Sequence, residues 1–202
     1  MTSLKNNASW LIYALVLTGL IAAPWLGAYP IFLMKCLCFA LFACAFNLLV
    51  GFTGLLSFGH AMFFGVAAYI GAHAAKVWGL TPELAVLSAT LGSALLGLLT
   101  GWLAVRRQGI YFAMVTLALS QCVYFIVYQM PASGGENGLR GVNLAEVSLL
   151  GIKLDLLNPL QKYYFILFFV GLAMVVLSRI LASPFGGVIE AIRENEARAR
   201  AC

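Results

Sequence analysis

Charged residues are scarce in this chain, and long stretches contain none at all. Only 9% of the 202 residues are charged and 63% are hydrophobic, whereas an ordinary soluble domain has about a quarter charged residues. Lys, Arg, Asp and Glu are all absent from residues 36–75, 84–105, 108–135 and 163–178. Each of these segments is long enough for at least one membrane crossing, which takes about 17 to 25 apolar residues. The composition therefore predicts an integral membrane protein.

Other absences exclude particular classes of function. No Asp or Glu precedes Glu83, and the later ones fall in expected loops or in the tail. A proton- or sodium-driven transporter usually needs an ionisable group within the membrane, so we expect the energy to come from outside the bundle. The sequence has no G-x-x-x-x-G-K-[ST] phosphate-binding loop, so any ATP is expected to bind to another subunit.

Three further kinds of site are not expected. The five cysteines have neither disulfide nor zinc spacing, and we expect no metal site. The net charge of +5 comes from basic residues scattered singly between apolar runs, which is typical of a membrane topology signal and not of a nucleic-acid partner. No acid accompanies His60 or His73 in the apolar runs, so an enzyme is not expected.

The lengths of the apolar runs predict about six membrane spans. Residues 36–75 would extend about 60 Å as one helix, twice the roughly 30 Å hydrocarbon thickness, so this run is expected to fold back at Gly51–Gly54. The same reasoning gives spans near residues 10–28, 31–50, 55–75, 84–105, 110–130 and 163–181. We therefore expect an all-α, polytopic helical bundle of about six transmembrane helices.

Six crossings place both ends on one side, and basic residues predict which side that is. One side receives Lys5, Arg106, Arg107, Arg179, Arg193, Arg198 and Arg200. The other receives Lys76, Arg140, Lys153 and Lys162 with Glu83, Glu136, Glu146 and Asp155. The first side is predicted to be cytoplasmic. We thus expect a transmembrane domain over residues 1–181 with an external loop at 131–162, followed by a cytoplasmic helix at 182–202.

Small residues and glycines predict how the spans pack and where the loop turns. Small residues recur at four-residue intervals, a pattern that lets helices approach closely in lipid: Ala67, Gly71 and Ala75 in the third span, and Ala89, Ser93, Gly97 and Gly101 in the fourth. In the external loop, residues 147–154 are expected to pair as a small hairpin, and its glycines mark turns.

The polar residues within the spans are few and neutral, and they are the candidates for a solute pathway. They are Asn47, Ser57, His60, Thr116, Ser120, Gln121 and Tyr124. Thr116, Ser120 and Tyr124 share one face of the fifth span, with Gln121 beside them. The same groups would serve equally well as hydrogen-bond partners between helices, so both interpretations stay open. For His60 alone, a satisfied structural histidine is the favoured interpretation.

The C-terminal tail reads as a short amphipathic helix. Ser183-Pro184 is typical of a helix start, Glu194/Arg198 and Glu196/Arg200 are favourable i,i+4 pairs, and Val188, Ile189 and Ile192 form an apolar side. Such a helix under the membrane can dock in a groove of an ATPase and convey its motion. The alternative is a basic helix lying on anionic lipid.

Four stretches together resemble a known family. They are NLLVGFTGLLSFGH at 47–60, RQGIYFAMVTLA at 107–118, GGENGLRG at 134–141 and SPFGGVIEAIRENE at 183–196. In this order they resemble the branched-chain amino-acid ABC transporter permeases of the LivM type, over most of the chain from about residue 40 onward.

The resemblance implies an importer in the bacterial inner membrane. It would contain a second permease of the LivH type, two cytoplasmic ATPase subunits that hold ATP and Mg, and a periplasmic amino-acid-binding protein; no cofactor is expected on this chain. Asn47, Gly51, Gly54, Ser57, Gly59 and His60 would belong to a glycine-rich pathway region. Gly134, Gly135, Glu136, Asn137 and Gly138 would face the binding protein. Glu190, Ala191, Arg193, Glu194, Asn195 and Glu196 would form the coupling segment.

The expected function is thus a permease subunit that translocates Leu, Ile or Val. A permease of the same family for urea, short amides or another small polar solute is one alternative, and a secondary transporter or channel is an alternative of a different class. Members of the family continue beyond the coupling helix with further spans, so the chain is expected to be incomplete at its C-terminus.

Overall fold

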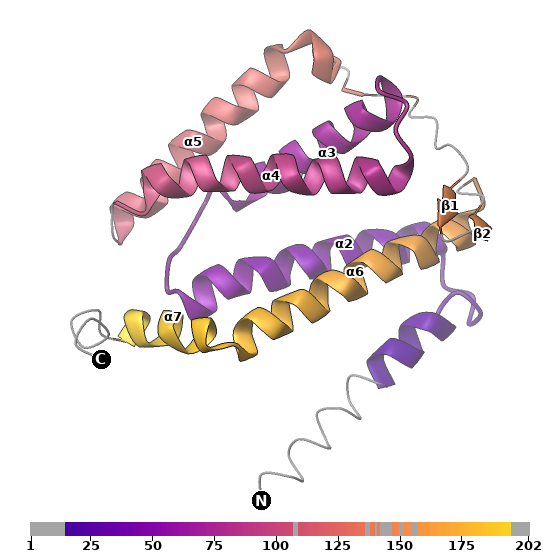
Figure 1. The fold of residues 1–202 in the computed structure, drawn as a ribbon, viewed down its shortest axis with the longest axis horizontal. Helices are drawn as coiled ribbons and strands as arrows, with labels where there is room; N and C mark the ends of the chain where they lie inside the picture. Colours follow the sequence, from indigo (N-terminus) through magenta and orange to yellow (C-terminus); the bar gives the residue numbers. More distant parts are fainter. Residues whose placement is uncertain are drawn as a thin grey trace, which may run out of the picture.

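The computed structural model describes residues 15–106, 109–135, 138–139, 141, 147–149, 152–154 and 157–194. This part of the chain is a set of helices joined by turns and longer connections, with one small hairpin (Figure 1). After a helical segment at residues 15–22, the elements are α2 (Pro30–Asn47), the π-helix η1 (Leu48–Phe52), α3 (His60–Lys76), α4 (Pro82–Ala104), α5 (Ile110–Gln129), the short 3-10 turn η2 (Pro131–Ser133), β1 (Val147–Leu149), β2 (Ile152–Leu154), α6 (Pro159–Ala182) and α7 (Pro184–Glu194).

Four of these helical stretches are long and apolar enough to cross a membrane. Among the described residues they are Pro30–Phe52, Pro82–Ala104, Ile110–Gln129 and Pro159–Ala182. They agree with the second, fourth, fifth and sixth expected spans. Large apolar side chains project outward along them; Leu91, Leu95 and Leu98 of α4, for example, are all exposed. The chain is therefore a multi-pass helical membrane protein.

The first and third expected spans differ from the structure. The third begins at His60 and not at residue 55, because residues 53–59 form a non-helical connection in which Gly54 has a φ of +70°. The predicted bend at Gly51–Gly54 is confirmed, although the helix continues through it as far as Phe52. Within the first expected span, residues 15–22 are helical and 23–27 form turns, while residues 10–14 lie outside the described residues.

The helices pack in two pairs that run lengthwise through the molecule (Figure 1). In the pair of α3 and α4, a Cβ on Gly71 would lie 3.4 Å from the Cβ of Ala89, and the Ser93 hydroxyl donates to the carbonyl of Phe63 at 3.2 Å. Gly71, Ala89 and Ser93 thus lie in the contact between these two helices as predicted, whereas nothing lies within 4 Å of a Cβ on Gly101. The second pair is α2 with α6, where Met34, Leu37 and Tyr163 form a buried cluster.

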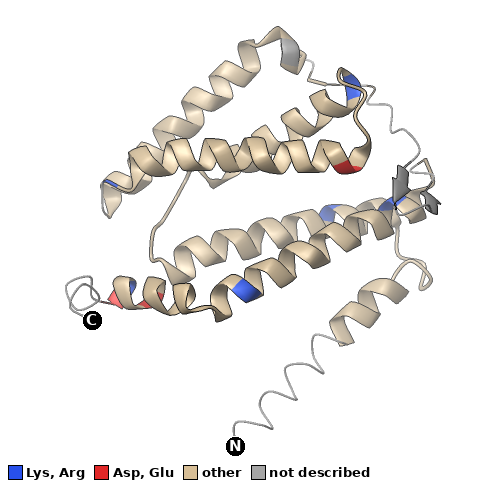
Figure 2. Cartoon of the chain, viewed as in Figure 1, with Lys and Arg blue, Asp and Glu red and all other residues tan. Residues whose placement is uncertain are grey.

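Charged residues gather at the two ends of the helices (Figure 2). Lys76 ends α3, Glu83 lies in the first turn of α4 and Lys162 in the first turn of α6. Arg106 follows α4, and Arg179 and Arg193 lie in the last turns of α6 and α7. These described members of the two predicted sets of charges therefore lie at opposite ends of the bundle. The end that carries α7 is called the α7 end below.

The segment between α5 and α6 contains the expected hairpin. β1 and β2 pair antiparallel, with Val147 opposite Leu154 and Leu149 opposite Ile152. Gly134, Gly135, Gly138 and Gly141 all have positive φ, which accounts for glycine at these turns. Glu136 and Asn137, predicted to face a binding protein, lie outside the described residues.

Two neighbouring tyrosines of α6 tie the N-terminal helical segment to the bundle. The fully buried Tyr163 donates its hydroxyl to the carbonyl of Leu20 at 2.6 Å, and Tyr164 donates to the carbonyl of Ile21 at 3.2 Å. The indole N–H of Trp25 in turn donates to the Tyr164 hydroxyl at 3.1 Å. The tyrosines thus satisfy carbonyls at a helix C-terminus, which have no partner within the helix.

We expect Tyr163→Phe to lower the free energy of unfolding by about 1 to 3 kcal/mol, because it leaves the Leu20 carbonyl without the donor that the buried Tyr163 supplies. The melting midpoint of the purified protein in detergent measures the effect. Tyr29→Phe is the matched control, since Tyr29 is exposed. Equal midpoints for the two variants would contradict the proposed tie.

Candidate functional site

The connection between α2 and α3, residues 53–59, lies where several predicted pathway residues meet. Phe58 donates its backbone N–H to the Thr116 hydroxyl at 3.3 Å, and that hydroxyl donates to the Ala113 carbonyl at 2.9 Å. Gly59 lies against the Thr116 carbonyl, and Ser57 is buried in the same connection. Thr116 is only 6% exposed. It therefore holds the 53–59 connection against α5, which is the helix-bonding interpretation of its position; a direct pathway role for it stays a prediction.

His60 begins α3 inside a ring of aromatic side chains. The centroid of its ring lies 5.2 Å from the ring centroid of Phe42, 5.7 Å from that of Phe46 and 6.0 Å from that of Phe63. Its Nδ1 is buried and has no hydrogen-bond partner in the described part of the chain. Aromatic side chains therefore pack around the ring, and the structural role favoured for His60 stays a prediction.

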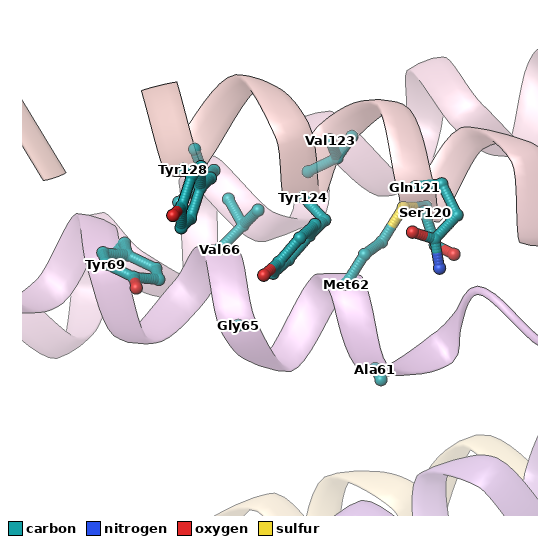
Figure 3. A pocket seen from close by; sticks show the side chains of 11 residues that line it. Ala61, Met62, Gly65, Val66, Tyr69, Ser120, Gln121, Val123, Tyr124 and Tyr128 are labelled. Carbon is teal, nitrogen blue, oxygen red and sulfur yellow. The ribbon is translucent and has the colours of Figure 1, made fainter. Parts of the chain in front are cut away.

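A pocket of about 280 Å³ opens between α3 and α5 (Figure 3). We call it the α3–α5 pocket. It is lined by Ala61, Met62, Gly65, Val66 and Tyr69 of α3, and by Ser120, Gln121, Val123, Tyr124, Val127 and Tyr128 of α5. Small-molecule sites in proteins run from about 300 to 1,000 Å³, so the size suits a small solute.

Three of the seven predicted pathway residues line this pocket together. They are Ser120, Gln121 and Tyr124, whereas Ser57 lies in the 53–59 connection, Thr116 and His60 adjoin it, and Asn47 ends α2. The contribution of α3 was not predicted. Tyr128 was missed as well, although it continues the four-residue spacing of Thr116, Ser120 and Tyr124.

The lining of the pocket has no formal charge and combines polar groups with aliphatic side chains. Hydroxyl groups come from three tyrosines and Ser120, and an amide comes from Gln121. Figure 3 shows Ser120 and Gln121 beside Met62 at one end, and Tyr69 and Tyr128 at the other. The rings of Tyr124 and Tyr128 stack with their centroids 6.0 Å apart. Neutral donors and acceptors above aliphatic walls fit a small solute that is partly polar and partly aliphatic.

At the α7 end, helix α7 follows α6 after the single residue Ser183. The Ser183 hydroxyl donates back to the Ile180 carbonyl at 2.6 Å, and α7 begins with Pro184, as predicted for its first turn. Gly186 is buried at this corner and lies against the backbone of Leu181. Only a glycine fits there, so the corner fixes the direction in which α7 leaves α6.

The predicted coupling residues are carried by α7. Glu190, Ala191, Arg193 and Glu194 lie on this helix, while Asn195 and Glu196 lie outside the described residues. Phe185, Val188 and Ile192 are 62%, 54% and 49% exposed. Their i, i+3, i+7 spacing places them on one face, whereas Ile189 is half-buried. The helix thus presents an apolar face that the described chain does not cover.

Arg193 makes the contact that joins α7 to the end of α2. Its guanidinium donates to the carbonyl of Gly51, and its aliphatic stem packs against Gly54. A predicted coupling residue and two residues of the predicted glycine-rich region are therefore in direct contact. Among the described residues, no three His, Cys, Asp or Glu side chains gather in a way that would hold a metal ion.

The comparisons of this chain with protein families and with curated proteins agree with each other. Residues 28–202 match the family described as the branched-chain amino acid transport system permease component. The chain is similar to the high-affinity branched-chain amino acid transport system permease protein LivM of Salmonella typhimurium (strain LT2) and to that of Escherichia coli (strain K12). Each is 29% identical to it over 76% of this chain and 41% of the relative. The chain thus spans about two fifths of the length of these curated relatives. No solved structure is significantly similar to it.

Proposed function

Because the chain belongs to the branched-chain amino acid transport system permease family, we propose that it is the transmembrane permease subunit of an ATP-binding-cassette importer. The solute is Leu, Ile or Val, and it passes through the α3–α5 pocket. The observation that carries the solute proposal is the lining of this pocket, where hydroxyl and amide groups lie beside Met62, Val66 and Val123 without a formal charge.

The chemistry of a branched-chain amino acid matches that lining. Its ammonium and carboxylate groups need hydrogen-bond partners, which Gln121 and the hydroxyls of Ser120 and Tyr124 supply. The Ser120 hydroxyl already donates to the Leu117 carbonyl at 2.7 Å, so its oxygen is the part that accepts from the solute. The branched side chain gains by leaving water for the aliphatic wall, at about 25 cal/mol per Å².

The α7 end is proposed to be cytoplasmic, and the chain to lie in the bacterial inner membrane with six crossings. Arg106, Arg179 and Arg193 of the described chain lie at this end, and Lys5, Arg107, Arg198 and Arg200 belong to it by sequence. Basic residues concentrate on the cytoplasmic side of membrane proteins. The loop with β1 and β2 then lies outside, where a periplasmic amino-acid-binding protein delivers the solute.

Energy is proposed to enter through α7. The described spans carry no Asp or Glu beyond Glu83 in the first turn of α4, so ion coupling lacks an acidic group to carry it. The exposed face of Phe185, Val188 and Ile192 has the spacing with which amphipathic helices insert into a groove. Two ATPase subunits would hold ATP and Mg and receive this face, and a second, different permease would complete the pathway. This chain itself would bind no cofactor.

Transport by the complete gene product, assembled with its ATPases and binding protein in proteoliposomes, tests the proposal. We expect ATP-dependent uptake of Leu, Ile or Val. Uptake of urea or a short amide in their place would reassign the solute within the family. Uptake driven by a solute or ion gradient without ATP would instead favour a channel or a secondary transporter.

Gln121→Leu probes the pocket directly. The variant keeps the size of the side chain and removes the amide, and one lost hydrogen bond of about 1.4 kcal/mol corresponds to tenfold in affinity. We therefore expect the solute concentration for half-maximal transport to rise about tenfold. Gln129→Leu is the matched control, because Gln129 ends the same helix outside the pocket. The pocket is not the pathway if the two variants transport alike.

A further inference from the structure

The contact between Arg193 and Gly51 joins residues 142 positions apart. The last carbonyls of a helix have no partner within it, and Gly51 lies in the closing turn of the α2–η1 helix. A guanidinium is well suited to such a carbonyl because it offers five N–H donors and a permanent charge. The tail helix thus supplies a hydrogen bond that the end of α2 cannot make for itself.

Gly54 makes room for this contact. A Cβ at this position would lie 3.1 Å from Cγ and 3.5 Å from Cδ of Arg193, and the φ of +70° is one that other residues rarely adopt. The Arg193 stem therefore rests directly on the first turn of the 53–59 connection. The π-helical turn η1 immediately before it is a form that is rare and is often found at functional sites.

The other end of the same connection is bound to the pocket helix. Phe58 and Gly59 contact Thr116 of α5, one turn before Ser120. His60 and Met62 follow directly in α3, and Met62 lines the α3–α5 pocket. The connection thus has one end held by α7 and the other held by the two helices that form the pocket.

We propose that Arg193 is the positioning residue through which a movement of α7 reaches the α3–α5 pocket, by way of the Gly51 carbonyl and the 53–59 connection. This inference rests on the proposed function, because it takes the ATPases to be what moves α7. When α7 shifts, Arg193 carries the end of α2 and the connection with it, and Thr116 passes the shift to α5. The pocket then changes its accessibility in step with the nucleotide.

The test measures how fast N-ethylmaleimide labels Val123→Cys in the complete transporter, with and without ATP. Val123 lines the pocket, and the native cysteines are first replaced by serine. With Arg193 present, we expect the labelling rate with ATP to differ about fivefold or more from the rate without ATP. Fivefold is about the lower limit of typical allosteric coupling. With Arg193→Met, which keeps the stem and removes the guanidinium, the difference disappears. Arg179→Met removes a positive charge from the same end and keeps the difference.

Each other outcome overturns the inference in a recognisable way. A nucleotide-dependent difference that survives Arg193→Met overturns the role of Arg193 and leaves the proposed function standing. A difference that is absent even with Arg193 in place overturns both. If the Arg193→Met chain does not assemble, spin labels at the exposed positions Leu56→Cys and Gly187→Cys, which lie outside the apolar docking face of α7, replace the variant. Their separation is expected to stay constant between nucleotide states, and a change in it overturns the proposal.

Discussion

The Gly186→Ala variant is expected to lose nearly all transport, because its new methyl group collides with the backbone at the corner between α6 and α7. A Cβ on Gly186 would lie 2.2 Å from the carbonyl oxygen of Leu181 and 2.9 Å from its carbonyl carbon. Backbone atoms cannot rotate away as a flexible side chain does. The corner has to open, which costs about 3 kcal/mol, the upper end for overpacking a tight site.

Opening this corner changes the direction of α7 and therefore both of its contacts. Arg193 at the far end of the helix leaves the Gly51 carbonyl, and the apolar face of Phe185 and Val188 no longer meets an ATPase groove at the right angle. We expect solute-stimulated ATP hydrolysis and uptake to fall together, while the melting midpoint drops by a few degrees.

Gly187→Ala is the matched control for this experiment. It lies in the same helix one residue later, and nothing is within 4 Å of the Cβ that it would gain. Both substitutions raise helix propensity by about 1 kcal/mol, so the collision is the main difference between them. Equal transport by the two variants would mean that the corner does not set the direction of α7.

The agreement between the predicted spans and the observed helices has a physical cause. A bilayer demands a minimum length of apolar helix with every backbone group paired, and the runs that became α2, α4, α5 and α6 satisfy that demand by composition alone. The start of α3 was predicted five residues too early. Leu55, Leu56 and Phe58 are as apolar as a helix would be, but the backbone of Phe58 bonds to Thr116, 58 residues later. Hydropathy contains no information about a hydrogen bond between segments that are far apart in the sequence.

The residues of the candidate site were likewise predicted only in part. The four-residue spacing on α5 identified Ser120 and Tyr124 as sharing a face, and these two line the pocket. Thr116 shares the face but is buried under the 53–59 connection, a difference that depends on what packs there. Tyr69 enters the pocket because α3 lies against α5, and no pattern in a single helix predicts which neighbour it meets.

The hydrogen-bond partner of Arg193 could not be predicted from the sequence. The residue was assigned to a coupling segment through its resemblance to a family, and the amphipathic pattern of α7 agreed with that assignment. Its acceptor is a backbone carbonyl, and every residue of a chain has one. Only the fold decides which carbonyl at a helix end is left without a partner and within reach.

The Gly59→Ala variant tests the opposite end of the 53–59 connection. Its Cβ would lie 2.6 Å from the Thr116 carbonyl oxygen and 3.2 Å from the carbonyl carbon. Gly59 has a φ of −88° and a ψ of 1°, a conformation that residues other than glycine adopt in type I turns, so the substitution mainly changes the available space. We expect the connection to be pushed away from α5, at a cost of about 2 kcal/mol.

This displacement should cost most of the transport activity, because it removes the hydrogen bond from Phe58 to Thr116 and moves the start of α3, which carries His60 and Met62. Solute uptake and the melting midpoint are the two measurements. Gly171→Ala in α6, where nothing lies within 4 Å of the new Cβ, is the control and should retain both. If Gly59→Ala transports normally, α5 and the connection move independently, and the pocket would have to receive its signal from α7 along another route.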